Sequence, residues 1–256
     1  MKIANVTLNG MNKYGSRLSC WLSDRCRDRR RRPDIVTLQK IGSKKRFPKE
    51  TFCDIGYECW LRDHEKHYRG VAVLAHRDFL SRPGLPPPEE LHCKLPGAAQ
   101  NEARFLTVRI GNVLISSIYA PVCKPTIAPT VDWLDCLRDH VEKEGYAKRA
   151  SLLCGDFNVP KIDDKSNGKL KRALKELKGL GFCDLYRKAH PCVTGNPGCT
   201  WGYREGDGTK GASRLHLILA SESLARRCRK IWLDGSPNLW PRPDAPPLVA
   251  ELDVEV

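Results

Sequence analysis

The chain has 256 residues, 41% of them hydrophobic, which suits one large α/β domain over residues 1–256. Its 44 Lys and Arg exceed its 30 Asp and Glu, and the net charge of +14 predicts attraction to polyanions. Among polyanions, nucleic acid is favoured as the partner over an anionic membrane surface or an acidic protein. No apolar run reaches about 18 residues and no repeat of about 20 to 50 residues occurs, which excludes a membrane-spanning protein and a repeat array.

The start of the chain and its cysteines indicate an intracellular protein, in the cytoplasm, the nucleoid or a nucleus. Residues 1–6 are typical of a strand and lack the apolar core of a signal peptide. The 12 cysteines are scattered and include no Cys-x-x-Cys, so a zinc site has little support. We expect most of them to be buried or partly buried free thiols.

Apolar runs and helical periodicity predict alternating strands and helices. In chain order we expect a strand at 1–6, a helix at 16–32, strands at 34–38, 70–74, 105–108 and 113–119, a helix at 132–144, a strand at 151–154, and helices at 169–178 and 222–229. Strands that follow one another directly, as at 105–119, indicate hairpins and therefore mixed or largely antiparallel sheets. Two sheets packed face to face with helices outside satisfy this pattern.

The strongest local motif is Gly-Asp-Phe-Asn at residues 155–158, which follows the predicted buried strand at 151–154. Asp156 and Asn158 are two residues apart, so their side chains point the same way if the strand continues. A carboxylate in such a place can position water for attack on phosphorus, and an amide can hold a phosphate oxygen.

Around this motif the chain resembles the exonuclease III-like AP endonucleases of the endonuclease/exonuclease/phosphatase superfamily. The matching segments occur in the family's order over nearly the whole length: residues 1–10, 33–39, 67–74, Glu102 with Arg104, Tyr119-Ala120-Pro121, 152–160, 181–191, 200–204, 214–221 and 244–252. The resemblance implies a four-layered α/β sandwich of two packed mixed sheets flanked by helices. It also implies a Mg²⁺-dependent phosphodiester hydrolase that acts at abasic sites or DNA 3′ ends.

The resemblance assigns roles to residues that this chain retains. Asp156 would orient the attacking water, and Asn158 and Tyr119 would hold the phosphate. The residues expected to contact nucleic acid are Asn9, Lys40, Arg104, Tyr119, Asn158, Arg187, Trp201, Arg204 and Arg214.

Other family positions are substituted in this chain, and they carry the chemistry. Thr7 stands where the family has an Asn, and Lys40 stands where it has the Glu that is its main metal ligand. An ammonium group cannot ligate Mg²⁺, which prefers carboxylate oxygens. His216 replaces the carboxylate that orients the catalytic His. In an alignment without gaps Ala245 replaces that His itself and Asp244 is kept; a slip of one residue puts Asp244 there, and the His is absent in both.

Three hypotheses follow from this pattern. In the first, the protein is a pseudoenzyme without a metal cofactor that binds DNA or RNA through a basic groove, with Lys40 either paired to Asp156 or Asp244 or pointing into solvent. In the second, Asp156, Asp244 and His216 form a rebuilt site around Mg²⁺, Mn²⁺ or Zn²⁺, or His216 serves as the acid. The alternative to the second hypothesis is that His216 has no catalytic role and is only hydrogen-bonded to Asp156 or Asp244.

In the third hypothesis the chain is a subunit of a larger nucleoprotein assembly, because a fold without its chemistry often serves as a binding surface. The basic runs at 29–32 and 44–46 would then grip nucleic acid held by other subunits. Trp232 and Trp240 would contact a protein neighbour, unless they belong to the buried core.

Overall fold

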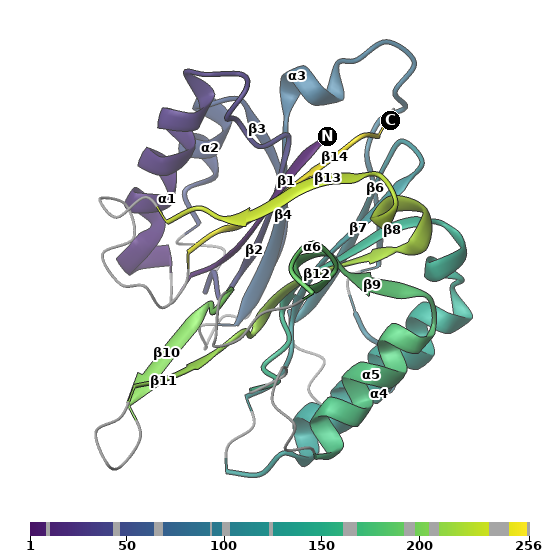
Figure 1. Ribbon diagram of the computed structural model, residues 1–256. Coiled ribbons are helices and arrows are strands. Elements are labelled where there is room, and N and C mark those ends of the chain that lie inside the picture. Colours follow the sequence, from purple (N-terminus) through teal and green to yellow (C-terminus); the bar gives the residue numbers. More distant parts are fainter. Residues whose placement is uncertain are drawn as a thin grey trace.

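The computed structural model describes residues 1–8, 11–42, 47–63, 69–92, 94–98, 103–122, 125–160, 168–191, 198–204, 210–235 and 246–254. Of residues 11–14, 201–204 and 210–212 the backbone alone is described. Within these ranges the chain forms two six-stranded sheets, a two-stranded hairpin and flanking helices, in the arrangement that Figure 1 shows.

The first sheet has the strand order β13-β14-β1-β2-β4-β3. Its strands are β13 (Cys228–Leu233), β14 (Leu248–Leu252), β1 (Lys2–Thr7), β2 (Ile35–Gln39), β4 (Gly70–His76) and β3 (Tyr57–Asp63). The sheet is mixed, because β1 and β2 are parallel while the other neighbours are antiparallel. The carboxyl ends of β1 and β2 therefore lie together at one end of the sheet, with Thr7 opposite Gln39.

The second sheet has the order β5-β6-β7-β8-β12-β9 and is also mixed. Its strands are β5 (Glu89–His92), β6 (Phe105–Ile110), β7 (Val113–Tyr119), β8 (Ala150–Asp156), β12 (His216–Ser221) and β9 (Phe182–Asp184). A separate hairpin pairs β10 (Trp201–Arg204) with β11 (Lys210–Ser213).

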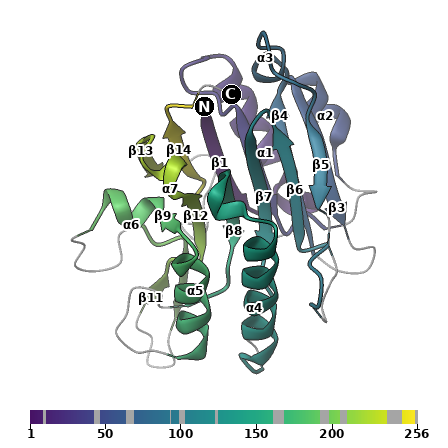
Figure 2. The same ribbon diagram turned by 90° about the vertical axis from the view of Figure 1, so that its right-hand side faces the viewer.

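The helices flank the two sheets. They are α1 (Met11–Cys26), α2 (Lys49–Asp54), α3 (Arg77–Leu80), α4 (Ala128–Lys143), α5 (Lys169–Gly179), α6 (Leu185–Ala189) and α7 (Glu222–Ala225), with a 3₁₀ turn at Tyr146–Lys148. One core lies between the sheets, a second under α1 and α2, and a third under α4 and α5. Figures 1 and 2 show these layers, helices, sheet, sheet and helices, so the predicted four-layered sandwich is confirmed.

Three predicted helices differ from the observed ones at their ends. The helix expected over 132–144 spans Ala128–Lys143. The helix expected over 16–32 begins at Met11 and ends at Cys26, before the arginine run. There the carboxylate of Asp28 accepts a hydrogen bond from the backbone N–H of Arg30 at 2.9 Å, a local turn that competes with helix. The helix expected over 222–229 ends at Ala225, because the alternating residues that follow form β13 against β14.

The described cysteines are all free thiols, and among them only Cys20 is exposed, which agrees with the expectation for most of them. None of the described helices is long and apolar enough to cross a membrane.

Gly155 is required where β8 passes close to β7. A Cβ atom at this position would overlap the backbone oxygen of Ile118, the residue opposite it on β7. Gly155 immediately precedes Asp156, so the close approach of these two strands fixes the place of the carboxylate.

We predict that Gly155→Ala lowers the free energy of unfolding by about 2 kcal/mol or more, because the backbone of β7 must move to admit a methyl group. Gly179→Ala at the end of α5 is the matched control, since nothing lies within 4 Å of a Cβ there. Urea denaturation of both variants measures the effect. Equal stability of the two variants would contradict the proposed close contact.

Candidate active site

Three site residues predicted from sequence are direct neighbours on adjacent strands of the second sheet. Asp156 at the end of β8 pairs in register with Tyr119 at the end of β7 and with His216 at the start of β12. Residues that are paired in register across a sheet point to the same side of it. The end of the second sheet therefore places an aromatic ring, a carboxylate and an imidazole side by side.

Lys40, which follows β2 in the first sheet, completes this group from the opposite sheet. Its Nζ atom lies 2.9 Å from Oδ2 of Asp156, and Nε2 of His216 lies 3.7 Å from the same oxygen. The side chain of Asp156 is 0% exposed and that of Lys40 is 20% exposed. Lys40 therefore does not simply point into solvent; its ammonium group forms a largely buried ion pair between the two sheets.

Burial and charge act in opposite directions on this ion pair. Burial alone would raise the pKa of Asp156, but the ammonium of Lys40, with a smaller effect of His216, holds it well below its usual range. Burial would lower the pKa of Lys40, and the charge of Asp156 reverses this and raises it. Both groups are therefore charged over the whole neutral pH range.

Both oxygens of Asp156 are engaged inside the protein. Its Oδ1 atom accepts a hydrogen bond from the backbone N–H of Asn158 at 3.0 Å, while Oδ2 faces Lys40. Asn158 in turn donates from its side-chain amide to the backbone oxygen of Ala120 at 2.7 Å. The carboxylate is thus held in one orientation from both sides.

A buried polar network below the ion pair joins the two sheets, and the sequence analysis missed it. The Oδ1 atom of Asn5 accepts hydrogen bonds from Thr37 at 2.9 Å and from Gln39 at 2.8 Å. The side-chain amide of Asn5 donates to backbone oxygens of β8 and β12 at 3.3 and 3.4 Å. Gln39 also donates to Ser117 on β7 at 3.1 Å.

Thr7, at the position where the family has an Asn, belongs to this network. Its hydroxyl donates to the side-chain oxygen of Gln39 at 2.8 Å. Gln39 directly precedes Lys40, so Thr7 helps to fix the residue from which the lysine extends. The signal that identifies the network in the sequence is a set of polar residues within strands that otherwise read as buried, namely Asn5, Thr37, Gln39 and Ser117.

Further positive charge surrounds Tyr119. The Nζ atom of Lys40 lies 5.2 Å from the centroid of the Tyr119 ring, and the guanidinium carbon of Arg104 lies 4.7 Å from it. Arg104 donates to the backbone oxygen of Tyr119 at 3.2 Å. Burial lowers the pKa of Arg104, and the nearby charge of Arg69 lowers it further. Arg69 was matched only as part of a strand, so its place near this site was not predicted from the sequence either.

The backbone at the site adopts left-handed conformations that residues other than glycine rarely adopt. Among the described residues other than glycine, φ is positive only at Lys40 (58°), Ala103 (46°) and Asn158 (50°). Lys40 and Asn158 are site residues, and Ala103 precedes Arg104. Such left-handed residues cost about 1 kcal/mol or more and persist where the surrounding structure fixes them. The network and the ion pair supply that fixation.

The described residues do not fit the Mg²⁺ ion that the fold family implies. They contain no group of three or more His, Cys, Asp or Glu side chains that is arranged to hold a metal. β8 contributes the carboxylate of Asp156 to the site, and the ammonium group of Lys40 lies 2.9 Å from its Oδ2 atom. Magnesium needs several oxygen ligands, and a fixed cation about 3 Å away repels it.

Two predicted nucleic-acid contacts lie in a different cluster, around Asp184. Arg214 forms a two-point ion pair with Asp184, at 2.8 and 3.1 Å, and the two side chains are 3% and 4% exposed. Arg187 donates its backbone N–H to Asp184 and its guanidinium to the backbone oxygen of His190 at 3.1 Å. In the structure the guanidinium of Arg214, which we expected to contact nucleic acid, is thus paired with a buried carboxylate.

The remaining predicted site residues are not described by the structure. Asn9, Asp244 and Ala245 lie outside the described residues, as does Glu102. The backbones of Trp201 and Arg204 lie on β10, and their side chains are not described.

The chain matches no protein-family model, but known structures resemble it over its whole length. It is 26% identical to an AP endonuclease from Archaeoglobus fulgidus, with a TM-score of 0.79, over 99% of this chain and 100% of that one. It is 23% identical to a 3′-5′ exonuclease from Neisseria meningitidis, with a TM-score of 0.79. It is 22% identical to a 3′ phosphatase from Neisseria bound to a product DNA hairpin, with a TM-score of 0.78. Both cover 99% of this chain and 100% of theirs.

These similarities and the two packed six-stranded sheets identify the class of protein: the chain has the endonuclease/exonuclease/phosphatase fold. Within that class its structural neighbours are exonuclease III-like, namely an AP endonuclease and a 3′-5′ exonuclease, as the ordered sequence motifs indicated.

We predict that Lys40→Met lowers the free energy of unfolding by about 3 kcal/mol at pH 7, because it leaves a buried carboxylate without its partner. In the wild type the pKa of Asp156 is lower in the folded than in the unfolded protein, where it is about 3.8, so the ionised carboxylate stabilises the fold above that pH. This stabilisation is lost as the pH falls from 3.8 toward the pKa of the folded state. In the variant, burial raises that pKa, so stability is lost as the pH rises above 3.8. The difference between the two proteins therefore grows with pH.

Urea denaturation between pH 3.5 and 7 measures this prediction. Lys148→Met, at an exposed lysine in the 3₁₀ turn, is the control and changes stability by about 0.5 kcal/mol or less. A Lys40→Met effect that is equally large at pH 3.5 and pH 7 would show that the lost interaction is not with an ionised carboxylate.

Proposed function

We propose that this protein is a catalytically degenerate relative of the exonuclease III-like nucleases that binds nucleic acid through a basic groove around Lys40, without a metal ion. The observation that carries the proposal is the ion pair of Lys40 with Asp156, 2.9 Å between Nζ and Oδ2. A protein cation stands beside the carboxylate that, by resemblance, would orient the attacking water.

The state of Asp156 argues against turnover. To orient a water molecule, a carboxylate oxygen must be accessible to it, and here the side chain of Asp156 is 0% exposed, with Oδ1 accepting from the Asn158 N–H and Oδ2 facing the Lys40 ammonium. The low pKa of Asp156 makes it a poor acceptor of a proton from water near neutral pH. Loss of a single catalytic group typically costs about 10²- to 10⁴-fold in rate, so joint losses leave little activity.

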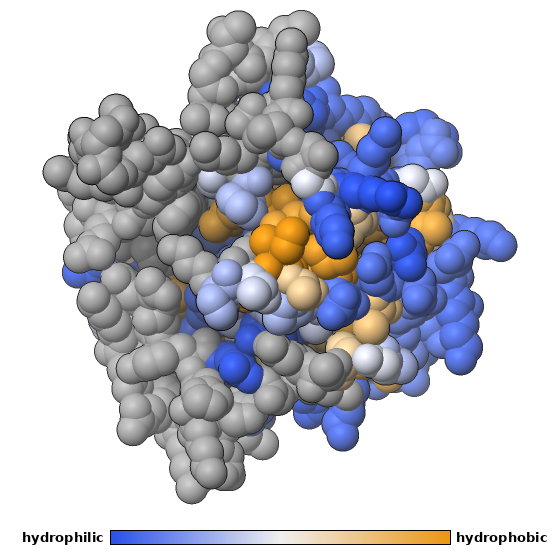
Figure 3. All heavy atoms as spheres, turned by 90° about the horizontal axis from the view of Figure 1, so that it is seen from below, coloured by the Kyte–Doolittle hydropathy of each residue, from blue (hydrophilic) through white to orange (hydrophobic). Residues whose placement is uncertain are grey.

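The charges that remain favour a phosphate ligand. Among the described residues, Lys40 and Arg104 place positive charge beside Asp156, and Arg69 adds a further charge near Arg104. The whole chain carries +14, which speeds encounter with a polyanion. A fixed ammonium supplies the attraction that a metal ion would otherwise supply, and it does so without activating water. Figure 3 views the end that holds the β10–β11 hairpin; hydrophilic side chains gather there on the side of α4 and α5.

The alternative function is an active phosphodiesterase with a rebuilt site, an AP endonuclease or 3′-5′ exonuclease that uses Asp156, Asp244 and His216. The 3.7 Å distance between His216 and Asp156 favours it, because it brings two of these three groups together. Such an enzyme would need Mg²⁺ or Mn²⁺, or the imidazole as an acid.

A role as a subunit of a larger assembly also stays a proposal. Arg29 and Arg32 of the basic run pair with Asp78, at 3.1 and 2.8 Å. Arg30 and Arg31 are exposed and remain the better candidates for an external partner.

We predict that labelled single-stranded and abasic duplex oligonucleotides bind equally well in EDTA and in Mg²⁺, and that affinity falls steeply with salt. Each phosphate contact contributes a slope of about −0.7 to −0.9 in a plot of log K against log salt. Arg69→Met and Lys40→Met each reduce the slope by about 1, and Lys148→Met leaves it unchanged. Fluorescence anisotropy measures the affinities.

The same oligonucleotides, incubated with Mg²⁺ or Mn²⁺ and run on a denaturing gel, test for cleavage. The proposal predicts intact substrate. Metal-dependent cleavage that Asp156→Ala abolishes would establish the active phosphodiesterase instead. An affinity that does not change with salt would contradict both the metal-free binding protein and the active phosphodiesterase, because both contact phosphates.

A further inference from the structure

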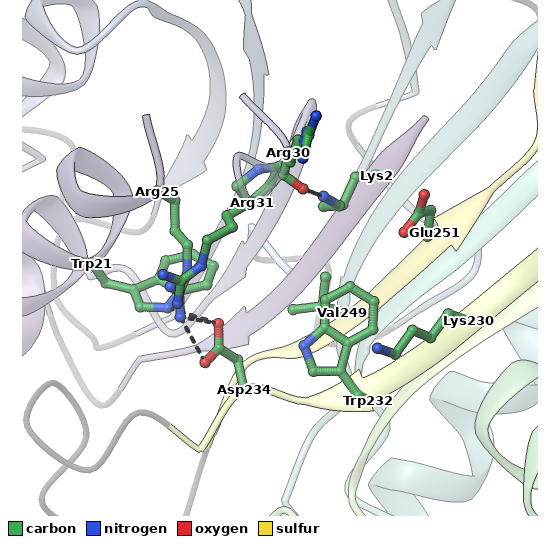
Figure 4. A pocket seen from close by; sticks show the side chains of 11 residues that line it. Lys2, Trp21, Arg25, Arg30, Arg31, Lys230, Trp232, Asp234, Val249 and Glu251 are labelled. Atoms are coloured by element: carbon green, nitrogen blue, oxygen red, sulfur yellow. Dashed lines mark hydrogen bonds and ion pairs between the residues drawn. The ribbon is translucent and has the colours of Figure 1, made fainter. Parts of the chain in front are cut away.

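A basic pocket of about 270 Å³ lies on the outer face of the first sheet, beside α1 and away from the candidate site. Figure 4 shows side chains from α1, the turn after it, and strands β1, β13 and β14 around it. Its lining residues are Lys2, Trp21, Arg25, Arg30, Arg31, Pro33, Lys230, Trp232, Asp234, Val249 and Glu251.

Strand alternation explains why this pocket exists. On β13, Ile231 points into the core between the sheets, so Lys230 and Trp232 point to the outer face. The helix α1 packs on β1 and β2, and Trp232 forms the edge of that core as a partly buried residue. The outer face of β13 and β14 is left as a hollow beside the helix.

The two acidic groups of the pocket lie beside basic residues. Both oxygens of Asp234 face Arg25, at 2.6 and 2.8 Å, and one accepts from the indole N–H of Trp21 at 3.2 Å. Glu251 lies between Lys2 and Lys230 in the strand register. Five basic and two acidic side chains line the pocket, so its net charge is +3.

The pocket also offers an aromatic surface next to exposed cations. The Nζ atom of Lys230 lies 5.2 Å from the centroid of the Trp232 ring. Arg30, Arg31 and Lys230 are exposed at its rim, whereas Trp21 and Arg25 are buried in its wall. A flat ring can stack on an indole while an attached anion meets the rim arginines, and base stacking of this kind is a common mode of nucleotide recognition.

We propose that this pocket is a second binding site, for one nucleotide, with the base against Trp232 and the phosphate at Arg30, Arg31 and Lys230. Its volume is near the lower limit of small-molecule sites, about 300 Å³, and suits a single nucleotide. The nucleotide is either free or one unit of a bound strand.

This site is independent of the proposed function. Lys2 begins β1 and Lys40 follows the end of the parallel β2, so the two sites lie at opposite ends of the sheet. They also lie on opposite faces, because Lys40 contacts the second sheet. A variant at Lys40 should therefore leave binding in the pocket unchanged.

Isothermal titration with AMP, adenosine, ribose 5-phosphate and a single-stranded trinucleotide tests the proposal. We expect saturable AMP binding that weakens about 5-fold or more in Trp232→Leu, the effect of losing one stacked base. The double variant Arg31→Ser/Lys230→Ser removes two exposed charges without touching the core, and it should weaken AMP binding by about 10-fold or more. The matched control is Lys148→Ser/Arg149→Ser, with two exposed charges in the 3₁₀ turn region.

Each outcome decides the proposal. AMP binding that the pocket variant weakens and the control does not supports a free nucleotide. Trinucleotide binding with this pattern, without AMP binding, supports one unit of a strand, provided that Lys40→Met does not remove it. The proposal is overturned if neither AMP nor the trinucleotide binds, or if the control pair weakens binding as much as the pocket pair.

Discussion

The ion pair between Lys40 and Asp156 is the interaction on which the candidate site depends. It joins the end of β2 in one sheet to the end of β8 in the other, where the carboxylate is fully buried. A buried pair of charges is costly to separate, because either charge alone would lack both water and a partner. The same contact puts a protein cation beside Asp156, and the proposed metal-free function rests on this observation.

The surroundings of the ion pair are organised to keep it in one arrangement. Asn5 and Gln39 link strands of both sheets through side-chain hydrogen bonds, and Gln39 directly precedes Lys40 in the chain. The left-handed backbone at Lys40 and Asn158 is a local cost that such a network offsets.

The fold could be predicted from the sequence, because the ordered motifs and the apolar runs identify buried strands from short segments of the chain. The contact of Lys40 with Asp156 was one of the alternatives that the sequence left open, because the family resemblance places both residues at the same site. The sequence did not predict the commitment of Arg214 to Asp184, because a partner 30 residues away is set by packing. The inter-sheet role of Asn5 and the pocket beside Trp232 depend on tertiary placement in the same way.

The most direct test of the account is a crystal of the wild-type protein soaked in Mn²⁺ and measured at a wavelength where manganese scatters anomalously. The account predicts no anomalous density beside Asp156 and the Lys40 ammonium at hydrogen-bonding distance from its carboxylate. An ion coordinated by Asp156, with the Lys40 side chain displaced from it, would contradict the account.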